Sequence, residues 1–255
     1  MKLLLLTISL LSSLISGRAA EAPAHIVILT VEDRSNYDAV NSMRGFAEKE
    51  LRPLGHRVTL LEGDKPEPTH FAGLIEALKD ADLLVLFVRR GTPPKEQLDA
   101  VRAHLEAGRP LLGIRTANHA FIPKKPVQDA RLAAWPEFTP EVLGGQNTGY
   151  ETKGMPYSVS VLPDAAGSPL LKGVDAESIR GHGSLYKNLP LAADATPLLL
   201  GTAQGQQPAQ PIAWTRPYGK NIARIFYTSL GAPDDMPQPA VRRLLLNAVL
   251  WTLGK

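Results

Sequence analysis

Pro110-Leu-Leu-Gly-Ile-Arg-Thr-Ala-Asn-His-Ala-Phe121 is the stretch of sequence that decides the fold. It starts with an apolar run that predicts a buried strand, and four polar side chains then follow at Arg115, Thr116, Asn118 and His119. A strand that runs through a tight turn into a helix is typical of α/β enzymes, many of which carry a nucleophile at that turn. Arg115 occupies the turn here, and the chain has no cysteine. The stretch therefore predicts a site and excludes thiol chemistry at it.

Strands and helices alternate regularly before this stretch ends. Apolar runs predict buried strands at residues 25–31, 57–61, 82–88 and 110–114. Helical spacing predicts helices at residues 37–51, 69–78 and 93–107. Thr69 is the expected N-cap of the second helix. This alternation predicts right-handed crossovers and a mostly parallel sheet with helices on both faces, which is an α/β fold.

The second half of the chain predicts extra loops and strands. Residues 122–157 are rich in Pro, Gly and polar residues and predict an inserted loop region. Apolar runs predict further strands at residues 158–162, 197–200, 211–214 and 222–228. Residues 241–253 predict a closing helix. Because neither a linker nor an internal repeat separates the halves, we expect a single domain over residues 21–255.

The first twenty residues predict a secretory signal peptide rather than a part of the fold. A positive start precedes an apolar run at residues 3–15 and a small-residue stretch at residues 16–20. The run is shorter than the roughly 20 residues that span a bilayer, although an uncleaved anchor is the alternative. We expect cleavage near residue 20, export to the periplasm or the cell exterior, and no stable membrane anchor afterwards.

Charge and composition narrow the class of partner. Loss of residues 1–20 removes Lys2 and Arg18 and lowers the formal net charge from +3 to about +1. A nearly neutral protein has no electrostatic footprint for nucleic acid, so we expect no nucleic-acid partner. Because there is no cysteine, the fold does not rely on disulfides. The sequence leaves the oligomeric state open.

Polar side chains follow four of the predicted strands. These side chains include Glu32, Asp33, Arg89, Arg115 and Asp235. Ligands of open parallel sheets lie outside the carboxyl ends of the strands, so we expect the side chains to converge on one rim. Structural alternatives are a salt-bridged turn after the first strand, a solvated end of the third, and a cap near the closing helix.

Arg115 needs a partner for its charge. It directly follows a buried strand, where an unpaired charge costs several kcal/mol, and we expect Glu32 or Asp33 to supply the carboxylate. A structural ion pair and a substrate-orienting role for Arg115 both remain open.

Two of the six histidines lie in turns with polar neighbours, namely His119 and His182. His182 belongs to a glycine-flanked loop that also carries Tyr186. No histidine pair has the close spacing of a zinc site, so we predict no metal. Neither a GxGxxG nor a Walker A motif is present, so we predict no nucleotide or other cofactor. The absence of a G-x-S-x-G elbow argues against a hydrolase serine.

An ordered set of segments carries a family resemblance. The set comprises Gly-Ile-Arg-Thr-Ala-Asn-His-Ala-Phe121, Leu143-Gly-Gly145, Leu185-Tyr-Lys187, Pro211-Ile-Ala-Trp214, Arg224-Ile-Phe-Tyr-Thr-Ser-Leu-Gly231 and Arg242-Arg-Leu-Leu-Leu-Asn-Ala-Val-Leu-Trp251. Together they resemble the ThuA-like (trehalose utilisation) family over nearly all of the mature chain. The resemblance implies a flavodoxin-like fold similar to class I glutamine amidotransferases, and a role in the metabolism of disaccharides or their keto forms.

Departures from both families bear on catalysis. Amidotransferases place a cysteine where this chain has Arg115, so glutamine hydrolysis by a thiolate is excluded. ThuA-like relatives often carry histidines where this chain has Tyr150 and Ala232. If those histidines move protons in the relatives, this protein would bind without catalysing.

Two functions therefore remain, and both have a small carbohydrate as ligand. The first is an exported enzyme that acts on a sugar, glycoside or keto-sugar, with His119 or His182 as general acid/base and Asp33 as a carboxylate partner. The expected substrate-binding side chains are Arg115, Thr116, Glu32, Arg89, Gln146, Tyr150, Tyr186 and Trp214. The second is a catalytically silent carbohydrate-binding protein built on the same pocket.

Overall fold

A computed structural model describes residues 22–32, 37–151, 155–203 and 208–255. The predicted signal peptide at residues 1–20 and the predicted carboxylate Asp33 lie outside the described residues.

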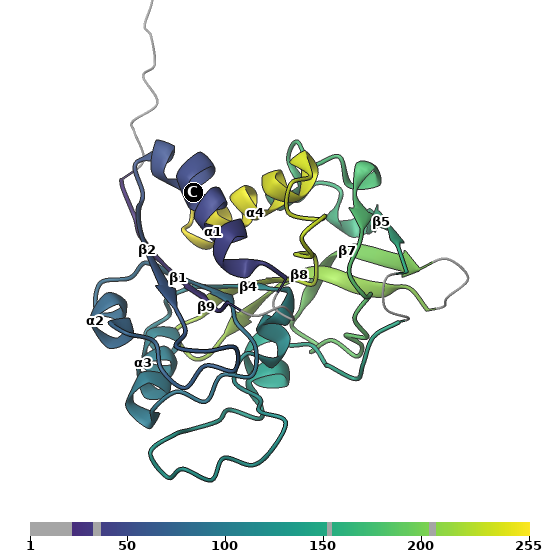
Figure 1. Ribbon diagram of the computed structural model, residues 1–255. Helices are drawn as coiled ribbons and strands as arrows, with labels where there is room; N and C mark the ends of the chain where they lie inside the picture. The colour runs from purple at the N-terminus through teal and green to yellow at the C-terminus, as the bar shows by residue number, and fades with distance from the viewer. Residues whose placement is uncertain (1–21, 33–36, 152–154, 204–207) are drawn as a thin grey trace, which may run out of the picture.

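Nine strands of the described chain form one sheet in the order β2-β1-β3-β4-β9-β8-β7-β5-β6 (Figure 1). The strands are β1 His25–Thr30, β2 Arg57–Glu62, β3 Leu83–Phe87, β4 Leu111–Ile114, β5 Tyr157–Val161, β6 Arg180–Gly181, β7 Thr196–Ala203, β8 Gln210–Tyr218 and β9 Ala223–Thr228.

Strands β2, β1, β3, β4 and β9 form the parallel half of the sheet. Their order is the flavodoxin-like order, with β9 as the fifth strand. Side chains alternate between the two faces, so that Ile26 and Ile28 enter one core and Val27 and Leu29 enter the other. Burial on both faces explains the continuous apolar runs that predicted these strands.

The other half of the sheet is antiparallel, and this corrects the expectation of a mostly parallel sheet. Strand β8 pairs antiparallel with β9 and β7, and β5 pairs antiparallel with β7 and β6. Only residues 219–222 separate β8 from β9, and only residues 204–209 separate β7 from β8. A parallel crossover needs about a dozen residues or more, so these short connections require antiparallel pairing.

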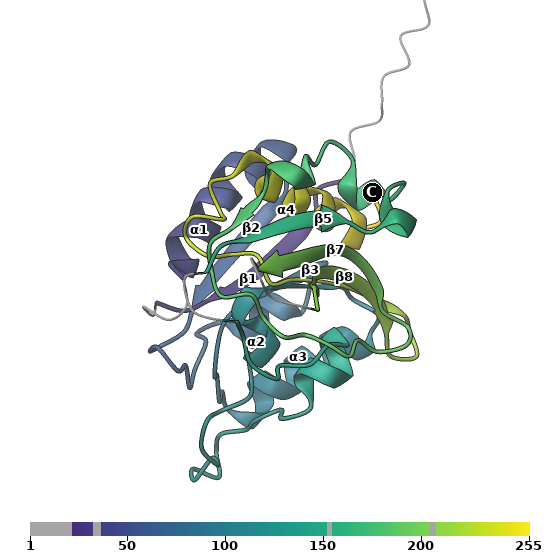
Figure 2. The same cartoon turned by 90° about the vertical axis from the view of Figure 1, so that its right-hand side faces the viewer.

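Two helical layers cover the sheet. Helices α1 (Ala39–Phe46) and α4 (Pro239–Thr252) pack on one face through residues such as Met43 and Leu244. Helices α2 (Leu74–Leu78) and α3 (Lys95–Glu106) pack on the other. Figure 2, seen from the antiparallel end, shows α1 and α4 above the strands and α2 and α3 below them. The short helical turns are η2 Ala47–Leu51, η3 Arg52–Leu54, η4 Arg115–His119, η5 Thr139–Leu143, η6 Pro163–Ala165, η7 Pro169–Leu171 and η8 Ala176–Ser178.

Local differences from the sequence prediction have local causes. Helix α2 begins after Gly73 rather than at Thr69. The Thr69 hydroxyl and amide both donate to the carboxylate of Asp64, at 2.8 and 2.7 Å, so Thr69 closes a loop instead of capping a helix. The expected loop at residues 122–157 contains the helical turn η5. Strand β6 was not predicted, because two residues are too few to show an alternating hydrophobic pattern.

We expect Gly181→Ala to destabilise the antiparallel half. Gly181 lies directly opposite Tyr157, and a Cβ atom at this glycine would lie 2.0 Å from Cζ of the Tyr157 ring. Because Tyr157 is buried, the ring cannot swing into solvent, and the free energy of unfolding should fall by about 2 kcal/mol. Urea denaturation measures this change. The matched control is Gly167→Ala, whose Cβ would meet no atom within 4 Å; an equal loss in both variants would contradict the steric explanation.

Candidate functional site

The carboxyl ends of the parallel strands meet at one edge of the sheet. The register places Thr30 of β1 opposite Phe87 of β3, and Ile114 of β4 opposite Thr228 of β9. The residues that follow these ends therefore lie along one edge. We call Arg89, Arg90, Arg115–His119 and Ser229 the strand-end rim.

Backbone strain is concentrated at this edge. Arg90, shortly after the end of β3 at Phe87, and Arg115, directly after β4, have left-handed φ angles of 57° and 43°. Tyr37 and Asp38 have similar angles between β1 and α1. Such a conformation costs a non-glycine residue roughly 1–3 kcal/mol, and it clusters at functional sites. Arg115 thus has the backbone geometry of a nucleophile elbow without a nucleophile.

The Arg115 side chain is fully buried. Its guanidinium donates to the carbonyl of Ser229 at 2.6 Å and to the carbonyl of Ser184 at 3.2 Å. It also lies over the rings of Tyr37 and Tyr186, with Cζ 4.3 and 4.7 Å from the two ring centroids. Carbonyl dipoles and aromatic faces thus stabilise the charge.

The expected ion pair between Arg115 and Glu32 is not present. Glu32 is exposed, and no ion pair between described residues involves Arg115. The Glu32 alternative is therefore wrong, because backbone carbonyls and ring faces attract the guanidinium instead. The Asp33 alternative lies outside the described residues. Full burial also keeps a ligand from touching Arg115 in this conformation.

His119 ends the turn η4 and is the titratable group best placed for chemistry. Its backbone carbonyl accepts a 2.9 Å hydrogen bond from the Arg90 amide. Nδ1 lies within hydrogen-bond distance of Asn118 Oδ1 and 3.2 Å from Asn147 Nδ2. Asn118 Oδ1 can only accept and Asn147 Nδ2 can only donate, so the two contacts require opposite tautomers of His119. The shorter contact is the one to Asn118, and it favours a proton on Nδ1, which leaves Nε2 with a free lone pair. The imidazole lies 6.5 Å from the Tyr186 ring, centroid to centroid.

The surroundings keep this imidazole neutral. The pKa of His119 is lowered from 6.5 to about 3, first by burial and then by the positive charges of Arg90, Arg89, Arg115 and Lys124. At neutral pH the ring can therefore accept a proton through Nε2 but has none to donate as an imidazolium.

Unpaired polar atoms gather at the same edge. Buried atoms without a hydrogen-bond partner include Arg90 Nε, Arg115 Nε, Asn118 Nδ2 and Ser229 Oγ. Each such group costs about 1–3 kcal/mol when left unsatisfied, so native proteins keep few of them. Their concentration on the strand-end rim indicates a site adapted to a ligand rather than to stability.

The other predicted side chains divide into two groups. Tyr186 and the half-buried Arg89 lie at the rim, and Thr116 is buried within it. Gln146 is half-buried, and its amide bonds the carbonyl of Asn188 at 2.9 Å in the segment that leads to Tyr150. The Tyr150 backbone bridges to Tyr186, but its side chain is 61% exposed.

Trp214 and His182 lie differently from the expectation. The Trp214 indole is buried in the core, donates to the carbonyl of Leu143 at 2.6 Å and packs 4.5 Å from the Tyr227 ring, so it lines no open pocket. The His182 side chain is exposed, and its backbone amide donates to Asp235 at 2.8 Å. Asp235 also accepts from the amides of Gly231 and Ala232 and so fixes the turn after β9.

Two site residues escaped the sequence prediction. Tyr37 stacks on Arg115, although its position at the start of a predicted helix gave no sign of this. Asn147 reaches His119 from the turn that follows Gly144 and Gly145, and the double glycine was the one signal that pointed there.

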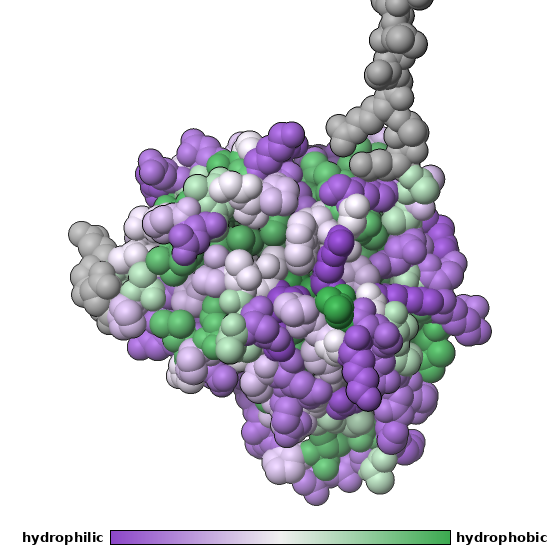
Figure 3. Space-filling model, turned by 180° about the vertical axis from the view of Figure 1, so that it is seen from behind, coloured by the Kyte–Doolittle hydropathy of each residue, from purple (hydrophilic) through white to green (hydrophobic). Residues whose placement is uncertain are grey.

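The described chain shows neither a metal cluster nor a membrane helix. No group of three or more His, Cys, Asp or Glu side chains among these residues is arranged to hold a metal ion. Within the same ranges, none of the helices has the length and apolarity that a bilayer crossing requires. Figure 3 shows hydrophilic and hydrophobic residues interspersed over the face seen from behind.

The chain matches one protein-family model and resembles solved structures from the same family. The family model described as ThuA, trehalose utilisation, matches residues 28–252. A solved ThuA-like protein from Bacteroides uniformis ATCC 8492 is 18% identical, with a TM-score of 0.66 over 93% of this chain and 94% of that one. A second, from Parabacteroides merdae ATCC 43184, is 16% identical, with a TM-score of 0.62 over 92% and 91%.

A carbohydrate-active enzyme contains a similar fold. The β-galactosidase of Halorubrum lacusprofundi is 13% identical, with a TM-score of 0.50 over 92% of this chain and 31% of that one. No curated protein matches the chain significantly. At these identities the structural likeness establishes the fold alone.

Proposed function

Because the chain belongs to the ThuA (trehalose utilisation) family, we propose that it is an exported enzyme that acts on a sugar, a glycoside or a keto-sugar. The family description supports a carbohydrate-related role. The signal-peptide pattern of residues 1–20 supports the export part of the proposal.

The observation that carries the catalytic part of the proposal is the state of His119. It is a neutral imidazole, its Nδ1 proton is directed to Asn118, and no hydrogen bond between described residues uses its Nε2. It lies at the carboxyl end of β4, where open α/β sheets bind ligands. In this proposal, His119 Nε2 is the general base that removes a proton from a sugar hydroxyl or from the carbon next to a keto group.

Amidotransferase chemistry has no place in this site. Arg115 occupies the elbow with its charge buried, and the chain has no cysteine to form a thioester. In this proposal Arg115 is a positioning residue, since its guanidinium contacts the rings of Tyr37 and Tyr186, and the Tyr186 ring lies 6.5 Å from the His119 ring.

A second candidate function is a catalytically silent carbohydrate-binding protein. The observation in its favour is the pKa of about 3 at His119, because so weak a base removes protons inefficiently. The exposed side chain of His182 offers no second titratable group at the buried part of the site.

A ligand screen followed by product analysis separates the two functions. Thermal shift with neutral sugars, trehalose and keto-glucosides identifies ligands, and chromatography of the mixtures then detects conversion. We expect conversion by the wild type and a rate about 100-fold lower or more in His119→Gln, with binding retained. The matched control is His70→Gln, an exposed histidine beyond the rim. Binding without any product would favour the silent protein, and no shift with any sugar would refute both.

A further inference from the structure

The positive charges of four side chains act on His119. Arg90 is attached to the segment that follows η4, because its amide donates to the His119 carbonyl at 2.9 Å and its guanidinium donates to the Ile122 carbonyl at 2.8 Å. Lys124 follows two residues later with 62% of its side chain exposed. Arg89 and the buried Arg115 complete the set, and all four charges lower the pKa of His119.

Arg90 has no ion-pair partner among the described carboxylates. Glu67 comes within only 4.0 Å of Lys124, and half of its side chain is exposed. Partial burial of the Arg90 guanidinium removes it from water, and this loss of solvation lowers the pKa of Arg90.

The unpaired atoms at this place are mostly donors. Arg90 Nε and Asn118 Nδ2 are two buried N–H groups without an acceptor. Positive charge and unused donors together call for a ligand with negative charge and acceptor oxygens. A carboxylate fits the planar fork of a guanidinium, and the sequence has no glycine-rich phosphate cradle after β1.

We infer that the ligand is an anionic carbohydrate, namely a sugar acid whose carboxylate is bound by Arg90. The exposed Lys124 attracts the same carboxylate from the solvent side. This inference rests on the proposed function and specifies the substrate class of the same site. The near-neutral net charge of the mature chain does not oppose it, because the positive charge is local to the rim.

Isothermal titration with matched sugars tests the inference. D-glucuronate and D-glucose differ by one carboxylate, and we expect glucuronate to bind the mature protein about tenfold more tightly or better. The preference should shrink as salt is raised, because screening weakens the attraction to exposed Lys124. Acetate should bind far more weakly than glucuronate. Glucose 6-phosphate should bind no more tightly than glucuronate.

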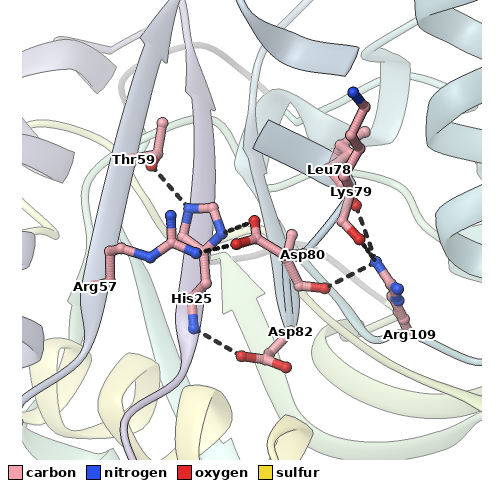
Figure 4. A network of polar contacts seen from close by, with 9 residues as sticks. His25, Arg57, Thr59, Leu78, Lys79, Asp80, Asp82 and Arg109 are labelled. Carbon is pink, nitrogen blue, oxygen red and sulfur yellow. Dashed lines mark hydrogen bonds and ion pairs between the residues drawn. The ribbon is translucent and has the colours of Figure 1, made fainter. Parts of the chain in front are cut away.

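Arginine variants at opposite edges of the sheet localise the effect. Arg90→Gln should remove most of the tenfold preference, whereas Arg57→Gln should keep it. Arg57 lies at the amino end of β2 and pairs with Asp80, which also contacts His25 at 2.8 Å (Figure 4). If circular dichroism shows that Arg90→Gln misfolds, Lys124→Gln is compared with Lys125→Gln, its exposed neighbour. We expect the preference for glucuronate over glucose to fall about threefold in Lys124→Gln and to stay unchanged in Lys125→Gln.

The outcomes separate the two proposals. Equal affinity for glucose and glucuronate, or a stronger response to acetate or to the phosphate, would overturn the sugar-acid inference and leave the carbohydrate function standing. Absence of binding by every carbohydrate would overturn the proposed function, and the inference with it.

Discussion

Replacement of Arg115 by alanine should lower the free energy of unfolding by about 4 kcal/mol. The change leaves the carbonyls of Ser229 and Ser184 buried without their donor, at about 1–3 kcal/mol each. It also removes two ring contacts worth about 1–2 kcal/mol each, and it leaves a cavity. Relief from a buried charge, worth several kcal/mol, offsets about half of this loss.

An exposed arginine with the same kinds of contact is the matched control. Arg224 donates to the Trp251 carbonyl at 2.8 Å and lies 5.7 Å from its ring, but it is exposed. We expect Arg224→Ala to lose less than about 1 kcal/mol in urea denaturation. A loss at Arg115 no larger than at Arg224 would show that the buried guanidinium does not support the fold, and it would restore a direct role in ligand binding.

The parallel half of the fold was predictable because of its burial. Strands such as β3 are covered on both faces, so the sequence must be apolar at every position, and that signal is strong. The place of the candidate site could be predicted too, because parallel strands end at a common edge. Arg115 and His119 were placed at this edge without knowledge of any contact.

The antiparallel half and the contacts of the site were less predictable. The turn between β8 and β9 is local, but the pairing of β5 with β7 joins distant segments and leaves no periodic signal. The partners of Arg115 are backbone carbonyls, which every residue has, so no residue type marks Ser184 or Ser229. Trp214 was predicted to bind substrate, but its indole is buried, because an aromatic side chain packs equally well in a core.

Acidification should destabilise the protein through two buried histidines. Burial lowers the pKa of His104 to about 4, and burial with nearby cations lowers that of His119 to about 3, from 6.5 in the unfolded chain. Between these values the unfolded chain binds protons that the folded protein does not, so the free energy of unfolding falls as the pH falls. The loss begins below pH 6.5 and is on the order of 3 kcal/mol per histidine by pH 4.

His104 allows the contribution of a single group to be measured, because it lies in α3 away from the strand-end rim. Its Nε2 lies 3.1 Å from the Pro110 carbonyl, and its Nδ1 is buried without a partner. Glutamine keeps a donor but does not titrate, so between pH 7 and pH 4 His104→Gln should lose about 3 kcal/mol less than the wild type in urea denaturation. The matched control is His70→Gln, whose side chain is exposed. If all three proteins lost equal stability, the acid sensitivity would have to arise from carboxylates, whose protonation removes ion pairs such as that between Glu50 and Arg242.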